Sequence, residues 1–340
     1  MSKLVIVSNR LPITLSRKGD TIDFLPSSGG LVTALKSAKI SNYVWIGWPG
    51  IEIGIKDKSH VEDILLKDYS CIPVYLEQKK ADLFYNGFSN GIIWPLFHYF
   101  PEEINFNEAQ WNAYHEVNSM FAETIRLHCQ NEKLIWVHDY QLMLLPKMLR
   151  GHFPDALIGF FLHIPFLSSE IYKVLPVREE ILEGLLGSNL IGFHTYDYSR
   201  HFINSCQRIL NCFIQSDEII YNGRKSKITV IPIGIDPLEF KEKLAETKTQ
   251  ETLSILSDKY EGKFVILGID RLDYIKGIPN KLLALKRLFE KFPNYIGKVI
   301  LLQIAIPSRT NVSEYQILRS YVNEIAGEIN GIYGKIFHKI

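Results

Sequence analysis

Short apolar runs alternate with longer amphipathic stretches along most of the chain. The runs Leu4–Val7, Leu134–Val137 and Ala156–Leu162 are continuous, which is typical of strands buried on both faces of a parallel sheet. The stretch Asn107–Cys129 instead spaces its large apolar side chains at helical steps. This alternation of strands and helices predicts an α/β fold with mainly parallel sheets. If the chain forms two α/β domains of this kind, a ligand-binding crevice is expected between them.

A change of composition divides the pattern in two. The Asn222-Gly223 dipeptide lies between apolar alternations and predicts a tight hairpin turn. It is followed by Lys241–Lys259, which is rich in Lys, Glu and Thr and indicates surface helices and a linker. We therefore expect one domain over residues 1–240 and a second over residues 241–340. The second is expected to contain a buried strand, a helix, a strand, a long helix and a final turn, at Phe264–Leu267, Pro279–Phe292, Val299–Ile306, Glu314–Ile329 and Gly331–Gly334.

Polar side chains follow several of the predicted strands directly. Arg10 lies on the loop after the first strand, because Pro12 cannot continue a central strand. Asp139 and His163 follow two later strands in the same way. Taken singly, a charged residue at such a position is more often a solvated surface group, and a histidine is more often a structural residue whose hydrogen bonds are already formed. The carboxyl ends of parallel strands share one edge of a sheet, however, so their repetition there favours a ligand site.

The stretch Gly268–Gly277 joins a predicted strand to a predicted helix and carries two cations. Arg271 and Lys276 would lie beside the N-terminus of that helix, where backbone N–H groups and the helix dipole also attract anions. This combination predicts a site for a doubly charged phosphate group. The loop Ser27–Gly30 also opens a helix, but its phosphate signal is weaker because such loops are usually caps and turns.

Aromatic residues are dense between Leu83 and Tyr99. Most are expected in the core, because aromatic side chains bury large areas. Asparagine and glycine interrupt the run, so a simple core helix is not expected, and aromatic faces beside amides also suit sugar contact. Core packing is the favoured interpretation, and sugar contact remains the alternative.

Composition narrows the function classes. The 340 residues are 46% apolar with a formal net charge of +1, which gives no reason to expect nucleic acid or an anionic membrane as a partner. The four cysteines show no metal-binding or CxxC spacing, and no apolar stretch is long enough for a signal peptide or a membrane span. A reduced, cytoplasmic protein is expected. The P-loop, GxGxxG and HExxH motifs are absent from the sequence, so the residues alone predict a two-domain enzyme for phosphorylated ligands.

A series of motifs in order resembles the trehalose-6-phosphate synthases, which are retaining glycosyltransferases with two Rossmann-like domains (the GT-B architecture). The resemblance covers nearly the whole chain, and its ordered combination is specific although each motif alone is weak. The motifs are Ser8-Asn-Arg-Leu-Pro12, Ser28-Gly-Gly-Leu31, Trp45-Ile-Gly-Trp-Pro-Gly50, Tyr85-Asn-Gly-Phe-Ser-Asn90, Trp94-Pro-Leu-Phe-His-Tyr99, Trp136-Val-His-Asp-Tyr140, Phe161-Leu-His-Ile-Pro-Phe166, Gly192-Phe-His-Thr195, Ile231-Pro-Ile-Gly-Ile-Asp236, Asp270-Arg-Leu-Asp-Tyr-Ile-Lys-Gly277, Ser308-Arg309 and Ile329-Asn-Gly331.

The resemblance implies transfer of glucose from UDP-glucose to C1 of glucose 6-phosphate, with retention and without a metal or other cofactor. The first domain would bind the acceptor and the second the donor nucleotide. On the acceptor side, the resemblance implies that the phosphate and ring are bound by Arg10, Tyr85, Trp94 and Arg309, that Trp45 lines the acceptor site, and that Asp139 hydrogen-bonds an acceptor hydroxyl. On the donor side, it implies that Gly29 and Gly30 lie against the pyrophosphate and that His163 contacts the sugar. The UDP phosphates would be bound by Arg271 and Lys276. His163, Asp139, Arg271 and Lys276 are the implied catalytic residues.

The chain departs from the family pattern at its end. The resemblance implies an Asp-Gly-Met-Asn-Leu-Val stretch and a later glutamate that bind the donor, and neither occurs in this sequence. The second domain is therefore expected to be incomplete, with a sheet edge and part of its core uncovered. A second copy of the chain or a trehalose-phosphate phosphatase is the expected macromolecular partner. The alternatives are a non-catalytic subunit of a trehalose synthase complex, or a GT-B transferase for another phosphorylated acceptor.

Overall fold

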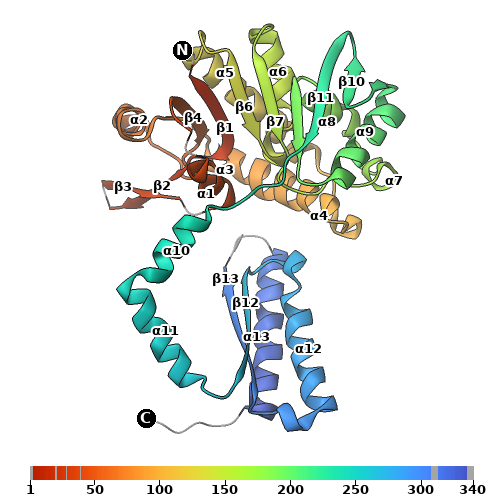
Figure 1. Cartoon of the computed structure of the whole chain (residues 1–340). Helices are drawn as coiled ribbons and strands as arrows, with labels where there is room; N and C mark the ends of the chain where they lie inside the picture. The colour runs from red at the N-terminus through yellow and green to blue at the C-terminus, as the bar shows by residue number, and fades with distance from the viewer. Residues whose placement is uncertain (1–2, 20, 28, 39, 308–312, 335–340) are drawn as a thin grey trace. The chain divides into compact units, whose positions relative to one another are not determined.

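The computed structural model describes residues 3–19, 21–27, 29–38, 40–307 and 313–334. The chain divides into two compact units, Met1–Ile235 and Asp236–Ile340 (Figure 1). The boundary expected at 240/241 falls inside the helix α10, Pro237–Ala245, which opens the second unit. This helix and the next, α11 (Thr247–Lys259), form the surface helices expected from the Lys/Glu/Thr-rich composition.

The first unit is built on one nine-stranded sheet with the order β5-β4-β1-β6-β7-β8-β11-β10-β9. The seven strands from β5 to β11 are parallel, and β10 and β9 add antiparallel edge strands. The strands are β1 (Leu4–Arg10), β4 (Tyr43–Trp48), β5 (Cys71–Pro73), β6 (Leu134–His138), β7 (Leu157–Phe161), β8 (Leu190–Phe193), β9 (Phe213–Gln215), β10 (Glu218–Tyr221) and β11 (Arg224–Val230). Their apolar side chains are largely buried, as predicted for strands with two covered faces.

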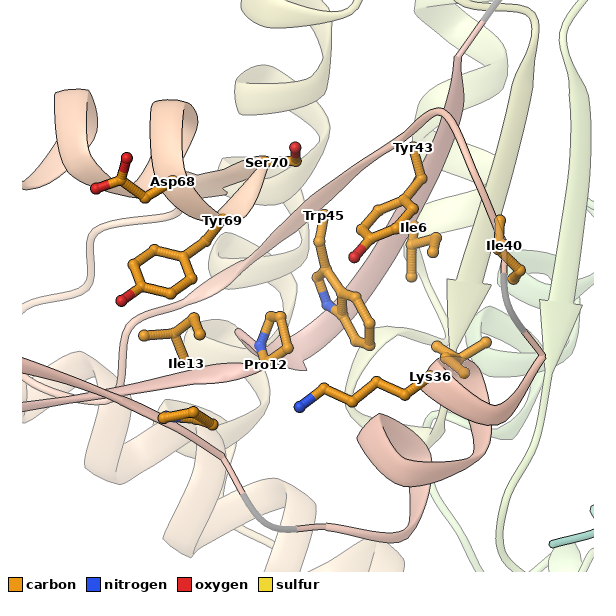
Figure 2. Close-up of a pocket in the computed structure, with 12 residues that line it drawn as sticks. Ile6, Pro12, Ile13, Lys36, Ile40, Tyr43, Trp45, Asp68, Tyr69 and Ser70 are labelled. Carbon is orange, nitrogen blue, oxygen red and sulfur yellow. The ribbon is translucent and has the colours of Figure 1, made fainter. Parts of the chain in front are cut away.

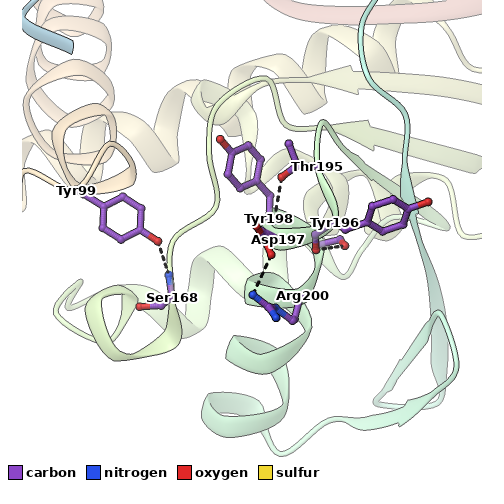
Figure 3. Close-up of polar contacts among 8 residues, drawn as sticks. Tyr99, Ser168, Thr195, Tyr196, Asp197, Tyr198 and Arg200 are labelled. Atoms are coloured by element: carbon purple, nitrogen blue, oxygen red, sulfur yellow. Dashed lines mark hydrogen bonds and ion pairs between the residues drawn. The ribbon is translucent and has the colours of Figure 1, made fainter. Parts of the chain in front are cut away.

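Helices connect these strands and cover the sheet. They are α1 (Gly30–Ser37), α2 (Ile55–Tyr69), α3 (Gln78–Ala81), α4 (Trp94–Phe97), α5 (Glu108–His128), α6 (Leu145–His152), α7 (Ser169–Tyr172), α8 (Arg178–Leu185) and α9 (Tyr196–Leu210). The cap of α9 is typical: the Thr195 hydroxyl accepts a hydrogen bond from the Tyr198 N–H at 3.3 Å, and Asp197 pairs with Arg200 one turn later at 2.9 Å (Figure 3). Close by, the Ser168 N–H donates to the Tyr99 hydroxyl at 3.2 Å.

The strand order places a topological switch point between β1 and β6. The chain runs from β1 outward through β4 to β5, and then returns to the other side of β1 with β6. The connections on either side of the switch leave the sheet in opposite directions, which opens a crevice at the carboxyl ends of the strands. Arg10 ends β1 and Asp139 follows β6, so both flank this crevice.

Two hairpins show what the sequence pattern could and could not reveal. The turn between β10 and β11 has Asn222 at φ 48° and Gly223 at φ 75°, as a two-residue hairpin requires, and confirms the expected turn. A separate hairpin of β2 (Ile13–Lys18) and β3 (Thr21–Pro26) was not predicted. Its burial pattern is partly exposed, and it lacks the continuous apolar run that marks a central strand.

The aromatic-rich segment forms a helix of an unusual kind. Residues Asp82–Ile93 are π-helical and continue directly into α4. The asparagines and glycines that argued against a simple core helix are accommodated in this wider turn, and Gly87 gives room to the Gln110 side chain of α5. Phe84 and Phe88 are fully buried, which confirms core packing for these two rings.

The second unit has a two-stranded parallel sheet of β12 (Phe264–Arg271) and β13 (Val299–Ile306), with eight residue pairs in register. Helices α12 (Ile278–Lys291) and α13 (Ser313–Tyr333) accompany it. Its buried core brings together Leu272, Ile278, Leu282, Leu318, Ile325 and Ile329.

Two expectations for the second unit were wrong. The strand expected to be buried is exposed: Phe264 is 66% and Ile266 48% exposed, because β12 pairs only with β13 among the described residues. The same exposure agrees with the expectation of an uncovered sheet edge and a partly uncovered core in this unit. The turn expected at Gly331–Gly334 is the last turn of α13, which runs on to Tyr333. Glycine lowers helix propensity by about 1 kcal/mol, and burial of the neighbouring Ile329 outweighs that cost.

Candidate active site

A cavity of about 430 Å³ lies at the switch point of the first unit. It is lined by the end of β1, the loop that opens α1, the turn after β4, the π-helical segment and the loop after β6. Five of the residues predicted from sequence come together in this wall: Arg10, Gly29, Gly30, Tyr85 and Asp139. Segments more than a hundred residues apart in sequence thus contribute to one hollow, and we call it the substrate cavity.

Arg10 supplies the cation of the substrate cavity. Its guanidinium carbon lies 4.2 Å from the centre of the Trp48 ring and 5.8 Å from that of Tyr85. The side chain retains exposed surface, yet desolvation of the guanidinium by these neighbours lowers the pKa of Arg10. A cation packed against two aromatic rings has lost part of its hydration and can bind an anion at less cost than a fully hydrated one.

Gly50 makes this position of Arg10 available. Its φ is +92°, and a Cβ at residue 50 would lie 1.7 Å from the Arg10 Nη1. Glycine is therefore required here for both backbone conformation and space. The sequence motif around Trp48 and Gly50 marked this turn, but its role in placing Arg10 depends on a contact that only the folded chain makes.

The backbone at the end of β1 is fixed by two further hydrogen bonds. The Trp45 Nε1–H donates to the Ser8 Oγ at 2.8 Å, and the Ser8 hydroxyl donates to the Arg10 carbonyl at 2.7 Å. Trp45 is only 3% exposed and lines a different cavity. The structure thus connects Trp45 to Arg10 through Ser8, and an acceptor-side wall at Trp45 stays a prediction.

Asp139 adopts a backbone conformation that is rare for a residue with a side chain, with φ 75° and ψ 170°. Such a conformation costs about 1–3 kcal/mol and persists only where neighbouring contacts enforce it. Its N–H donates to the Phe161 carbonyl at 2.8 Å, and its Oδ1 accepts from the His163 N–H at 3.2 Å. The strained loop therefore holds the carboxylate of Asp139 at the edge of the sheet and ties it to the strand that carries His163.

Helix α5 holds the same loop from beneath. The buried Tyr114 hydroxyl donates to the Tyr140 carbonyl at 2.7 Å and accepts from the Met143 N–H at 3.1 Å. Asn118 Nδ2 donates to the Gln141 carbonyl at 3.1 Å. Burial raises the pKa of the Tyr114 phenol, so this hydroxyl stays protonated and can make both bonds.

Three histidines follow the neighbouring strands β6, β7 and β8. The ring centres of His138 and His163 are 5.4 Å apart, and those of His163 and His194 are 5.7 Å apart. Burial lowers the pKa of His163 to about 4, holds that of His138 well below its usual range and lowers that of His194. All three rings are therefore neutral near pH 7.

The contact between two of these rings indicates their tautomers. His138 Nδ1 lies 3.1 Å from His163 Nε2, and His138 Nε2 is buried without a hydrogen-bond partner in the part of the chain that the structure describes. A buried N–H without an acceptor is rarer than a buried lone pair without a donor. This favours a proton on Nδ1 of His138, donated to His163, and a proton on Nδ1 of His163. Sequence analysis named His163 alone, because a contact between two histidines 25 residues apart has no sequence signature.

Trp94 does not line the substrate cavity. It is 6% exposed, and its ring packs 4.2 Å from that of His98 and 5.6 Å from that of Tyr140. The Tyr140 hydroxyl in turn donates to Asn90 Oδ1 at 2.8 Å. Trp94 therefore packs behind the loop that carries Asp139, and direct contact with a sugar stays a prediction.

The second unit carries the predicted phosphate-binding stretch. Arg271 ends β12, 3.5 Å from the fully buried carboxylate of Asp273, whose Oδ1 accepts from the Ile275 N–H at 3.3 Å. Lys276 is exposed, and within the described residues its ammonium makes no hydrogen bond or ion pair. Gly277, at φ 61°, then turns the chain into α12. Both cations thus lie at the carboxyl end of a parallel strand beside a helix N-terminus, as expected.

A charged cluster supports this stretch from the side. Asp270 accepts from Lys281 Nζ at 2.6 Å and from Gln303 Nε2 at 2.9 Å, and Lys281 together with Gln303 lowers its pKa. A Cβ on Gly268 would lie 2.1 Å from Gln303 Oε1, so the glycine admits this side chain. Arg309 lies outside the described residues.

Two kinds of feature are absent from the described residues. No group of histidine, cysteine, aspartate and glutamate side chains there has the arrangement of a metal site. No described helix combines the length and apolar character needed to cross a bilayer. The four cysteines are buried and unpaired.

A nine-stranded sheet with polar side chains at its switch point, followed by a second α/β unit with cations at a strand end, fits the GT-B architecture of the solved structures that match this chain. The solved trehalose-6-phosphate synthase of E. coli bound with UDP-2-fluoro glucose matches 98% of this chain and 71% of its own, with 33% identity and a TM-score of 0.86. The synthase of Burkholderia xenovorans in complex with glucose-6-phosphate matches 98% of this chain and 72% of its own, with 28% identity and a TM-score of 0.82.

The sequence comparisons give the family. The model of glycosyltransferase family 20 matches residues 2–340, and the chain belongs to this family. A UDP-forming α,α-trehalose-phosphate synthase from Dictyostelium discoideum is 50% identical over 335 residues, which are 98% of this chain and 46% of that protein. The chain spans between about half and two thirds of the length of the first curated relatives that it matches.

Proposed function

We propose that the protein transfers glucose from UDP-glucose to glucose 6-phosphate with retention, giving α,α-trehalose 6-phosphate and UDP. The observation that carries this proposal is the substrate cavity, where Arg10 lies against two aromatic rings and lines the same hollow as Asp139. A cation and a hydrogen-bond acceptor in one polar cavity suit a phosphorylated sugar. The family, and relatives whose printed names include this activity, support the same choice.

In the proposed reaction the acceptor is held in the first unit. Arg10 pairs with the phosphate of glucose 6-phosphate, and Tyr85 packs beside the sugar. Asp139 accepts a hydrogen bond from a sugar hydroxyl, which fixes the orientation of the ring. The strain at Asp139 is consistent with such a positioning task, because an enforced backbone conformation keeps the carboxylate in place before the ligand arrives.

The donor is proposed to lie against the loop of Gly29 and Gly30 and against the second unit. Arg271 and Lys276 pair with the phosphates of UDP, and His163 contacts the donor sugar. A new bond forms between the acceptor C1 oxygen and the glucose C1, while the bond from that carbon to the UDP phosphate oxygen breaks. The leaving phosphate oxygen takes the proton of the attacking hydroxyl, so no protein nucleophile is required.

Charge develops on the leaving phosphate in this step, and Arg271 and Lys276 would stabilise it together with the helix N-terminus. Because the positive charges of Arg271 and Lys276 would stabilise the leaving phosphate, we propose that the reaction requires no metal or other cofactor. Addition of EDTA should then leave the rate unchanged, whereas a loss of rate that Mg²⁺ restores would contradict this part of the proposal.

The reaction itself is tested by UDP release from UDP-glucose with the whole natural polypeptide. Glucose 6-phosphate is compared with fructose 6-phosphate, mannose 6-phosphate and glucose as acceptors. Release that depends on glucose 6-phosphate supports the proposal, and preference for another acceptor indicates a different GT-B transferase. Absence of release with every acceptor, while glucose 6-phosphate still binds, indicates a non-catalytic subunit.

The binding part can be tested in the chain itself. Arg10→Gln should weaken glucose 6-phosphate about 10- to 100-fold in calorimetry, the usual scale for losing charge-assisted hydrogen bonds. Arg17→Gln is the matched control, because Arg17 pairs with Asp57 at 2.7 Å and does not line the substrate cavity. Equal affinity of both variants for glucose 6-phosphate would show that Arg10 does not bind this ligand.

We also propose a cytoplasmic location, for which the four buried, unpaired cysteines are the support. A trehalose-phosphate phosphatase that consumes the product, or a second copy of the chain, is the proposed partner. Co-purification of the natural polypeptide at endogenous level, with size-exclusion chromatography of the pure protein, distinguishes these two partners.

A further inference from the structure

A second cavity, of about 500 Å³, lies in the first unit beside the substrate cavity (Figure 2). Ile13 belongs to the walls of both. The other lining residues come from β1, β3, β4, the ends of α1 and α2, and the loops between them; they are Ile6, Pro12, Pro26, Leu35, Lys36, Ile40, Tyr43, Trp45, Asp68, Tyr69 and Ser70. None of the roles assigned above, apart from that predicted for Trp45, uses this hollow, which we call the rear cavity.

The walls of the rear cavity suit a flat apolar molecule. The rings of Tyr43 and Trp45 meet edge to face with centres 6.5 Å apart, and Tyr69 is stacked on Phe24 at 6.4 Å. Figure 2 shows the Trp45 indole and the Tyr43 ring turned into the hollow. Aromatic walls contribute large contact areas and fixed planes, so an aromatic ring is the shape that they complement.

Two charged residues line the same space, Lys36 and Asp68. The Lys36 side chain extends from α1 into the rear cavity below the Trp45 indole, whereas Asp68 lies on the other side (Figure 2). Lys36 is exposed, and within the described residues its ammonium makes no hydrogen bond and no ion pair. An ammonium that is directed into an aromatic cavity and forms no ion pair with the carboxylate that also lines it favours a ligand with its own anionic group.

We propose that the rear cavity binds a small aromatic carboxylate, with its ring against Trp45 and Tyr43 and its carboxylate on Lys36. The ligand acts on the substrate cavity through two connections. Trp45 donates to Ser8, which donates to the Arg10 carbonyl, so a ring pressed against the indole displaces the backbone that carries Arg10. Helix α1 is the second connection, because its Lys36 lines the rear cavity and its first residue, Gly30, lines the substrate cavity.

The expected result is negative coupling, because the hydrogen bonds through Ser8 already hold Arg10 where Trp48 and Tyr85 enclose it. A ligand that moves Trp45 weakens binding of glucose 6-phosphate, and glucose 6-phosphate weakens the ligand by the same factor. The existence of the rear site is independent of the function proposed above, whereas its regulatory effect rests on that function.

The site is tested with 3-phenylpropionate as probe, by ligand-observed NMR on the chain. A Kd of the order of 1 mM is expected for a ligand of this size. Lys36→Met should weaken probe binding about tenfold. Lys67→Met, at a position of α2 that does not line the rear cavity, should leave the Kd of the probe unchanged. Ile40→Trp, which places a larger side chain in the wall of the cavity, should abolish binding. Binding of the uncharged amide 3-phenylpropionamide as tight as that of the acid, or unchanged affinity in Lys36→Met and Ile40→Trp, would overturn the site. Thermal melts confirm that each variant is folded.

The coupling is tested by titrating glucose 6-phosphate at zero and at saturating probe. A rise in its Kd of about threefold to tenfold is expected, within the usual range of coupling free energies. The rise should disappear in Lys36→Met and persist in Lys67→Met. Probe binding without any change in the Kd of glucose 6-phosphate would overturn the regulatory effect and leave the site. Absence of glucose 6-phosphate binding without probe would instead count against the function proposed above, and not against the site.

Discussion

Replacement of Gly50 by alanine should displace Arg10 without replacing any residue that is proposed to contact substrate. Gly50 has φ +92°, and its added Cβ would lie 1.7 Å from Arg10 Nη1 and 3.0 Å from Arg10 Cζ. The neighbouring atom is the far end of a flexible side chain, so the guanidinium moves and leaves the face of Trp48. The backbone of residue 50 also becomes strained, because L-residues rarely adopt this φ.

Two separate losses follow from this change. The strained backbone and the lost cation–π contact should lower the free energy of unfolding by about 2–3 kcal/mol. The misplaced guanidinium should weaken glucose 6-phosphate about 10- to 100-fold, which corresponds to the charge-assisted bonds that Arg10 would make. Denaturant unfolding measures the first loss, and isothermal titration calorimetry measures the second.

Gly223→Ala is the matched control. Gly223 also has a positive φ, of 75°, but no atom lies within 4 Å of its added Cβ, and it belongs to the β10–β11 turn. It should lose a similar amount of stability and keep its affinity for glucose 6-phosphate. If both glycine variants bind equally well, the contact between Gly50 and Arg10 does not place the ligand cation. In the double variant Gly50→Ala/Arg10→Gln, the Gly50 change should cost no further affinity.

Three further predictions concern other parts of the two units. Lys276→Ala in the natural polypeptide should lower kcat about 10²-fold or more, because a charge on the leaving phosphate loses its partner; Lys291→Ala, in the last turn of α12, is the control, and an unchanged kcat would make Lys276 structural. Tyr114→Phe should lower the free energy of unfolding by about 1–3 kcal/mol, because the Tyr140 carbonyl and the Met143 N–H lose their buried partner; an unchanged chemical denaturation midpoint would show that water replaces the hydroxyl. Stability should also fall as pH decreases from about 6.5 to about 4, because burial lowers the pKa of His163 to about 4 and the unfolded chain then binds a proton that the folded chain excludes. In denaturant titrations at pH 7 and pH 5, His163→Gln should reduce this slope, and an identical slope in the variant would assign it to other groups.

Much of the fold could be predicted from local pattern. Continuous apolar runs identified most of the central parallel strands, since a strand covered on both faces must be apolar throughout. The Asn222-Gly223 turn was equally clear, because both residues accept positive φ. The same reasoning failed for β12, which is exposed. An apolar run shows that a strand can be buried, but the neighbouring elements decide whether it is covered. The β2–β3 hairpin was missed because its side chains are only partly buried.

The sequence by itself determined which chemical groups stand at the strand ends, because a strand is recognised locally and the residue after it is read directly. Arg10, Asp139, His163 and Arg271 were found in this way. The tertiary structure decided what surrounds them: the aromatic enclosure of Arg10, the space left by Gly50 and the contact of His138 with His163. These depend on the strand order that places β1 beside β4 and β7 beside β6. Distances between residues far apart in sequence follow from packing of the whole sheet, which no local pattern contains.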